Sequence, residues 1–181
     1  MFDVNFWGAM NVSKEALRVF REVNKPAGGR LLQVSSMAGL VGGPALTIYH
    51  ASKFALEGLS ESIAAEIDPE WNIKVTLIEL GVYNTGGIDR IVVMPSHPAY
   101  TQPGSAITAF RGLLDNRDGL RNTGDPAKAA AAMYKLTTLP NPPLHLPLGK
   151  DSVAAARSKV AQLAAETDQY ESWSDGLKVG E

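Results

Sequence analysis

The 181-residue chain carries 17 basic and 19 acidic residues, so its formal net charge at pH 7 is −2, and 45% of its residues are hydrophobic. No run of one charge sign stands out, which argues against a nucleic-acid or membrane surface. The absence of cysteine excludes disulfides, thiolate nucleophiles and zinc–thiolate sites.

The first residues and the hydropathy predict a cytoplasmic location. The opening sequence, MFDVNFWGAM, has an acid at position 3 and no basic residue before an apolar core, so it is not typical of a signal peptide. No apolar run approaches the roughly 18–20 residues of a membrane-spanning helix. We therefore expect a cytoplasmic protein that binds neither nucleic acid nor a membrane.

The first half of the chain predicts helices and buried strands in alternation. Residues 3–24 have apolar side chains at spacings of three and four, which favours an amphipathic helix, and the Pro/Gly-rich segment 25–29 ends it. Residues 30–35 and 73–79 are short and rich in branched side chains, as expected of strands covered on both faces. Between them, residues 47–67 predict a long helix. Its continuous i, i+4 row consists of Ala51, Ala55, Leu59, Ile63 and Ile67.

The segment 81–124 is long and interrupted by glycine and proline, which predicts a connection of the kind that often covers a functional site. A helix is expected over 124–136, because Asp125 suits the N-cap and Pro126 suits the first helical position.

The last third predicts a short edge-type strand over 144–147 and a helix over 151–166. The whole alternation is typical of an α/β fold with a parallel sheet. We predict a partial Rossmann-like, doubly wound sheet of about three strands that occupies residues 1–165 as one domain. Residues 166–181 are expected to form a loosely held C-terminal tail.

Tyr49 and Lys53 lie one helical turn apart on the predicted helix, and such a pair has two readings. It is either a solvated surface pair or a proton donor whose pKa is lowered by the neighbouring ammonium. Ser36, which ends the preceding strand, supplies a second group that could hold a substrate oxygen, although a serine there also suits a turn or a cap. Ligands of parallel sheets bind outside the carboxyl ends of the strands, so the three residues are expected to converge there.

Four stretches of the sequence carry a family resemblance. VSSMAG, YHASKFALEGLSESIAAEI, VTLIELGVYNT and the preceding FDVNFWGAMNV together resemble the short-chain dehydrogenase/reductase family, over almost the whole chain. The resemblance implies that Tyr49 is the general acid/base and that Lys53 lowers its pKa and holds the nicotinamide ribose. It further implies that Ser36 orients the substrate oxygen and that Asn5 holds a water of the proton relay.

The resemblance also implies a nicotinamide cofactor, NAD or NADP, contacted by Gly81, Val82 and Thr85 as well as by Tyr49 and Lys53. The chain departs from the family pattern at Leu80, where the family usually has proline. It also contains no glycine-rich G-x-G-x-x-G motif or variant for the cofactor's pyrophosphate. We therefore expect the catalytic half of such an enzyme, without the first strands of the family sheet.

Two functions stay open on the sequence alone. One is an NAD(P)-dependent oxidoreductase of small alcohols or carbonyl compounds, whose catalytic half this is. The other is a truncated, catalytically silent relative that acts through self-association or protein binding. We expect the isolated chain to be inactive or nearly so.

We also expect a homodimer or larger oligomer, because strand 30–35 leaves an edge unpaired and the resembled family uses helix 47–67 as a dimer contact.

The sequence predicts no metal site. His50, His97 and His145 are scattered, and none stands at a ligand spacing from an acidic residue or another histidine.

Overall fold

The structure is a computed structural model that describes residues 1–180. Its first helix runs through wide π-helical turns at both ends: η1 (Asp3–Gly8), α1 (Ala9–Arg18) and η2 (Val19–Val23). The remaining elements, in chain order, are β1 (Gly29–Val34), α2 (Thr47–Glu66), β2 (Ile73–Leu80), α3 (Ala106–Asp115), α4 (Asp118–Arg121), α5 (Pro126–Thr137), β3 (His145–Leu148) and α6 (Lys150–Tyr170). Short 3₁₀ turns join several of them.

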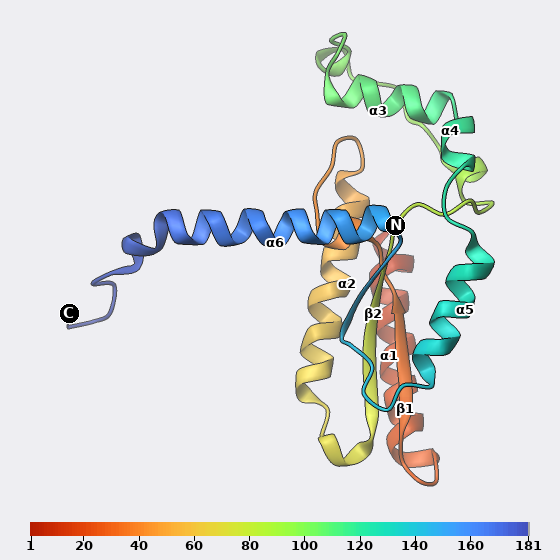
Figure 1. Ribbon diagram of the computed structural model, residues 1–181, viewed down its shortest axis with the longest axis vertical. Coiled ribbons are helices and arrows are strands. Elements are labelled where there is room, and N and C mark those ends of the chain that lie inside the picture. The colour runs from red at the N-terminus through yellow and green to blue at the C-terminus, as the bar shows by residue number, and fades with distance from the viewer. Residues whose placement is uncertain (181) are drawn as a thin grey trace.

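The three strands form one parallel sheet in the order β1-β2-β3, which confirms the predicted α/β class. Gly29 pairs with Ile73, and Leu77 pairs with His145. Each strand lies within one residue of its predicted position, and β3 begins and ends one residue later than expected. In the view of Figure 1 the strands lie between α2 and α5, while α6 extends away from the sheet.

The core is centred on β2, the middle strand. Leu77 and Ile78 are fully buried, and half of the residues of the strand are β-branched, as expected where both faces are covered. Its buried Thr76 hydroxyl donates to the Pro143 carbonyl at 2.7 Å, which satisfies a polar group that water cannot reach. This bond also ties the segment before β3 to the centre of the sheet.

Serines let the helices approach the sheet and each other. Ser13 of α1 accepts a hydrogen bond from the Gln33 side chain of β1 at 2.8 Å, and both residues are buried. Ser52 and Ser60 on α2 are fully buried, as is Leu56 between them. Small side chains on this face allow close packing, and the Ser60 hydroxyl is satisfied by the Leu56 carbonyl one turn earlier.

The predicted connection 81–124 contains regular structure. Residues 106–115 form α3, whose N-cap Ser105 accepts a hydrogen bond from the Thr108 amide, and α4 follows it. The predicted loop is therefore wrong for this part, because Ser105 and the apolar spacing after it form a standard helix start. The helix predicted over 124–136 is confirmed, and Asp125 caps it by accepting from the Ala127 amide at 2.8 Å.

The C-terminal helix is longer than expected. It was predicted over 151–166, but α6 continues to Tyr170, and a 3₁₀ turn follows over Glu171–Ser174. From Val160 onward every described residue is exposed, so this half of the helix leaves the body of the protein. Within residues 1–180, none of the helices has both the length and the apolar character needed to cross a membrane.

Candidate functional site

The carboxyl ends of β1 and β2 open onto a cavity of about 380 Å³. Four of the predicted site residues line it together: Ser36, Tyr49, Gly81 and Val82. The rest of the wall is largely apolar and includes Ile88, Phe110 and Leu114. The position agrees with the rule for parallel sheets, since strand ends and the following loops converge there.

Ser36 lies two residues after the end of β1 and lines this cavity. Its hydroxyl accepts from the Ala38 amide at 3.2 Å and lies 3.4 Å from the Leu80 carbonyl, to which it donates. The first distance exceeds the 2.9–3.0 Å that is usual for an amide donor, and the second exceeds the 2.7–2.8 Å that is usual for a hydroxyl donor. The hydroxyl is therefore held weakly and is free to turn toward a ligand oxygen.

Tyr49 and Lys53 lie side by side on the first turns of α2. The Lys53 ammonium donates to the Val34 carbonyl at the end of β1, at 2.9 Å, and lies 6.0 Å from the centre of the Tyr49 ring. Burial lowers the pKa of Lys53, and the nearby Glu57 carboxylate opposes this shift. The lysine is thus fixed between the sheet and the tyrosine, although it does not itself line the cavity.

Asn5 reaches the same region from the first helix. Its side-chain amide donates to the Ser52 hydroxyl at 3.1 Å, and Ser52 in turn donates to the Tyr49 carbonyl at 2.8 Å. Asn5 is therefore linked to the backbone of the tyrosine through one buried serine. Ser52 was not singled out from the sequence, where it is simply the residue before Lys53.

Gly81 lies against the start of α6. Its amide donates to the Leu148 carbonyl at 2.9 Å, and the following Val82 amide donates to the Asp151 carboxylate at 2.7 Å. A Cβ on residue 81 would collide with that carboxylate, so a larger residue here would displace Asp151 from the Val82 amide. Thr85 is exposed and outside the cavity lining, and its hydroxyl accepts from the Gly87 amide.

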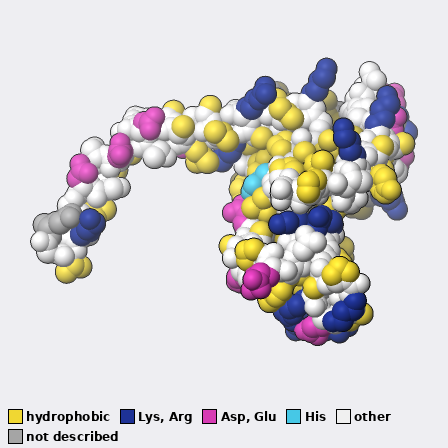
Figure 2. Space-filling model, turned by 60° about the horizontal axis from the view of Figure 1, so that its bottom comes forward, with side chains coloured by type: hydrophobic (Ala, Val, Ile, Leu, Met, Phe, Trp, Pro, Cys, Tyr) yellow, Lys and Arg dark blue, Asp and Glu magenta, His cyan; other side chains and the backbone are white. Residues whose placement is uncertain are grey.

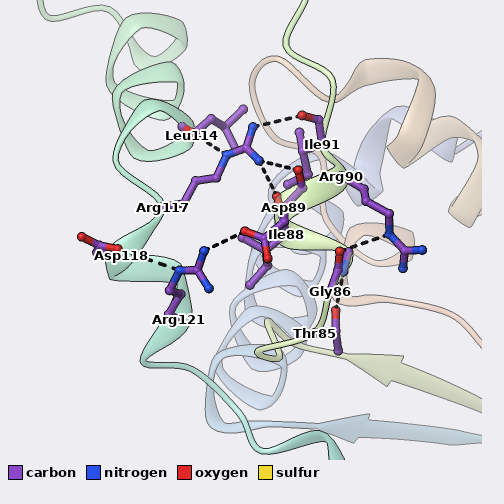
Figure 3. A network of polar contacts seen from close by, with 11 residues as sticks. Thr85, Gly86, Ile88, Asp89, Arg90, Ile91, Leu114, Arg117, Asp118 and Arg121 are labelled. Carbon is purple, nitrogen blue, oxygen red and sulfur yellow. Dashed lines mark hydrogen bonds and ion pairs between the residues drawn. The ribbon is translucent and has the colours of Figure 1, made fainter.

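An arginine holds the outer wall of the cavity in place. The Arg117 guanidinium donates to the carbonyls of Ile88, Asp89 and Ile91 at 2.8–3.0 Å, and also to that of Leu114. Figure 3 shows this planar guanidinium, called the Arg117 fork below, with its hydrogen bonds to the turn 88–91. A separate ion pair joins Arg121 to Asp89 beside it. The Arg117 fork thus connects the end of α3 to the turn that carries Ile88.

A second cavity, of about 620 Å³, lies between α2, the sheet and α6. Three side chains that are far apart in the sequence meet in its wall: Glu57, Glu79 and His145. Figure 2 shows apolar side chains gathered around the base of the projecting helix, with a histidine and an acidic side chain at their edge. This cluster could not be recognised from residue spacing, because its members come from α2, β2 and β3.

The buried carboxyls of this cluster have shifted pKa values. Burial raises the pKa of Glu57 to about 7; the Glu79 and Glu61 carboxylates add to the rise, and His145 opposes it. The Ser35 hydroxyl lies beside the carboxyl without completing a hydrogen bond to it, and it too lowers the pKa. Burial also raises the pKa of Glu79, against the effect of its hydrogen bond with His145.

Comparisons with known proteins give a consistent family. Residues 1–92 match the family model described as short chain dehydrogenase. An uncharacterized oxidoreductase of Schizosaccharomyces pombe is 41% identical over 167 residues, which cover 92% of this chain and 55% of that protein. A 3-ketodihydrosphingosine reductase of Bacteroides thetaiotaomicron is 34% identical over 147 residues, covering 81% of this chain and 52% of that protein.

A solved structure extends the likeness to nearly the whole chain. The crystal structure of a short-chain dehydrogenase from Streptomyces avermitilis superposes with a TM-score of 0.81 at 28% identity, covering 98% of this chain and 61% of that one. The chain spans about half the length of the curated relatives it matches.

Proposed function

Because the chain belongs to the short-chain dehydrogenase family, we propose that it carries the catalytic residues of an NAD(P)-dependent oxidoreductase acting on a small alcohol or carbonyl compound. The observation that carries the proposal is the cavity at the carboxyl ends of β1 and β2. It unites Ser36 and Tyr49 with Gly81 and Val82 in a mostly apolar enclosure. Such a cavity suits a substrate with one polar group and an apolar remainder.

In this proposal Tyr49 exchanges a proton with the substrate oxygen, and the Ser36 hydroxyl donates a hydrogen bond to the same oxygen. Lys53, fixed on the Val34 carbonyl, stabilises the tyrosinate by its charge. Asn5 orders the region through Ser52 and holds a water of the relay. In the oxidation direction the alcohol loses its hydroxyl proton toward Tyr49 and a hydride from its carbon, which becomes the carbonyl carbon.

The residues fit the nicotinamide end of a dinucleotide. Tyr49 and Lys53 would hold the ribose, and Gly81, Val82 and Thr85 would meet the carboxamide. NAD(P), when bound, accepts or supplies the hydride. Within the printed sequence no glycine-rich loop is present for the pyrophosphate, so we propose weak cofactor binding and little turnover by the 181-residue chain alone.

The test combines cofactor titration with turnover assays. The chain is titrated with NADH and NADPH by calorimetry and then assayed on a panel of secondary alcohols, aldehydes and ketones. We expect any turnover to vanish in Tyr49→Phe while the affinity for NADH falls by no more than about tenfold, as for the loss of one ribose hydrogen bond. Tyr134→Phe is the matched control, since this tyrosine is 75% exposed on α5. Turnover that survives Tyr49→Phe would refute the assigned role.

The silent alternative makes the opposite prediction. If neither cofactor binds at millimolar concentration and no substrate reacts, the chain acts, if at all, through association.

We propose self-association in either case, with the first helix and α2 as the contact. Support comes from the exposed apolar residues Val4, Trp7 and Val12 on the first helix and Ile48 on α2. Light scattering that reports a monomer at micromolar concentration would contradict this. The cytoplasmic location stays a prediction.

A further inference from the structure

We propose that Glu57, Glu79 and His145 form a binding site for a divalent metal ion of the zinc type. The three side chains come from α2, β2 and β3 and meet in the wall of the 620 Å³ cavity. This cavity is distinct from the one that Tyr49 lines, because the two share no lining residue. The proposal does not depend on the oxidoreductase activity.

The spacing of the donor atoms suits a single ion. The Nδ1 atom of His145 lies 2.7 Å from Oε1 of Glu79 and 3.8 Å from Oε2 of Glu57. One ligand atom from each of the three residues lies within 4.8 Å of the others. Around a tetrahedral zinc with bonds near 2.0–2.1 Å, neighbouring ligand atoms are roughly 3.3 Å apart. The two measured separations bracket this value, so small side-chain movements complete the arrangement.

Three of the four buried carboxylate oxygens of Glu57 and Glu79 have no hydrogen-bond partner among the described residues, and the fourth, Oε1 of Glu79, is paired with His145. Glu57 is 5% exposed and Glu79 is 0% exposed. Buried polar atoms without partners are costly, and two buried carboxylates also repel each other. A divalent cation would bind these free lone pairs and balance both negative charges.

The histidine is oriented as a metal ligand. Its Nδ1 atom faces the two buried carboxylates, while its Nε2 atom lies 3.6 Å from the Glu61 carboxylate. A metal-bound histidine commonly donates its other ring N–H to a carboxylate, which selects the tautomer and raises the basicity of the ligand atom. In the metal-bound form the ion would replace the proton between Nδ1 and Glu79, and Nε2 would carry the ring proton. A small movement would bring Nε2 within hydrogen-bond reach of Glu61, the positioning residue of the proposed site.

The cavity gives the ion a way in and a further ligand. The His145 side chain is 42% exposed, so the donor set is reached from the cavity side. Three protein ligands leave one tetrahedral position for a water molecule. An imidazole nitrogen beside two carboxylates favours zinc or a similar transition metal, whereas magnesium and calcium prefer oxygen ligands alone.

The experiment measures metal binding directly. Chelator-treated protein is titrated with Zn²⁺ by calorimetry, and Co²⁺ is added separately so that its visible absorption reports the coordination. We expect one Zn²⁺ per chain, the absorption of tetrahedral Co²⁺, and no competition by excess Mg²⁺. His145→Gln should weaken Zn²⁺ binding by more than about a hundredfold, and Glu61→Gln by roughly ten- to a hundredfold. His97→Gln, an exposed histidine in the segment before α3, is the matched control and should bind as the parent chain does.

The outcomes separate clearly. Glu61 is a half-exposed surface side chain, so its variant reports on the site even if replacement of a buried ligand prevents folding. Absence of stoichiometric Zn²⁺ binding would overturn the proposal. So would equal affinity in the parent chain, Glu61→Gln and His145→Gln, because the ion would then be bound elsewhere.

Discussion

Replacing Arg117 by lysine should loosen the outer wall of the Tyr49 cavity without unfolding the sheet. The guanidinium makes four hydrogen bonds to backbone carbonyls, three of them in the turn 88–91. A lysine ammonium is a point donor and cannot reproduce the planar fork, so we expect it to keep one of these bonds. At a net contribution of about 0.5–1 kcal/mol for each partly exposed bond, the loss of three bonds amounts to about 2 kcal/mol.

The change should be local and measurable by hydrogen exchange. A local cost of about 2 kcal/mol corresponds to roughly thirtyfold faster opening. We expect that increase at the amides of Ile88, Arg90 and Ile91, and a smaller one through α3. The amides of β2 should be unchanged, because Arg117 contacts no residue of that strand in the described structure.

The matched control is Arg157→Lys, which makes the same exchange at an exposed position on α6. If the amides of the turn 88–91 exchange equally slowly in Arg117→Lys and Arg157→Lys, the Arg117 hydrogen bonds do not stabilise the outer wall of the Tyr49 cavity. The reasoning from hydrogen-bond geometry to local stability would then be wrong.

Three further predictions concern individual polar side chains. Ser13→Ala should lower the free energy of unfolding by about 1–3 kcal/mol in urea titrations, because the buried Gln33 amide loses its acceptor. The pKa of Glu57 is about 7 in the folded protein but near its usual value in the unfolded chain. In the presence of a chelator, the free energy of unfolding should therefore fall by at most about 3 kcal/mol as the pH rises from 4.5 to 7. Glu57→Gln should flatten that slope in urea titrations at pH 5 and pH 7.5, and an unchanged slope would point to another group. Asp151→Ala should speed proteolysis after β2, because the Val82 amide loses its acceptor, and unchanged cleavage would argue against that tie.

Local chemistry made most of the fold predictable. The i, i+4 row of 47–67 and the capping residues Asp125 and Pro126 specify helices through contacts within a few positions, and both helices were found there. Ser105 caps α3 by the same local chemistry, although the glycines and prolines of the segment 81–124 favour a loop. The prediction for residues 106–115 was therefore wrong even though a local helix signal was present.

The Tyr49 cavity was partly predictable for a different reason. In a parallel sheet the strand ends converge, so Ser36, Tyr49 and Gly81 could be brought together from their order along the chain. Thr85 was expected beside them, yet it is exposed and lies outside the cavity lining. No rule of spacing could predict the meeting of Glu57 with His145. It depends on which side chains of α2 and β3 face each other.

The projecting half of α6 has a mechanical consequence. The helix is 21 residues long, or about 32 Å at 1.5 Å per residue, and only its first half packs against the rest of the described chain. There the buried Ser152 hydroxyl donates to the Glu79 carbonyl at 2.6 Å. A rotation of the helix axis by about 10° around this anchor on the central strand would therefore displace the far end of the helix by roughly 5 Å. Because Trp173 lies just past that end and is 77% exposed, a probe there would magnify small rearrangements at the sheet into easily measured displacements.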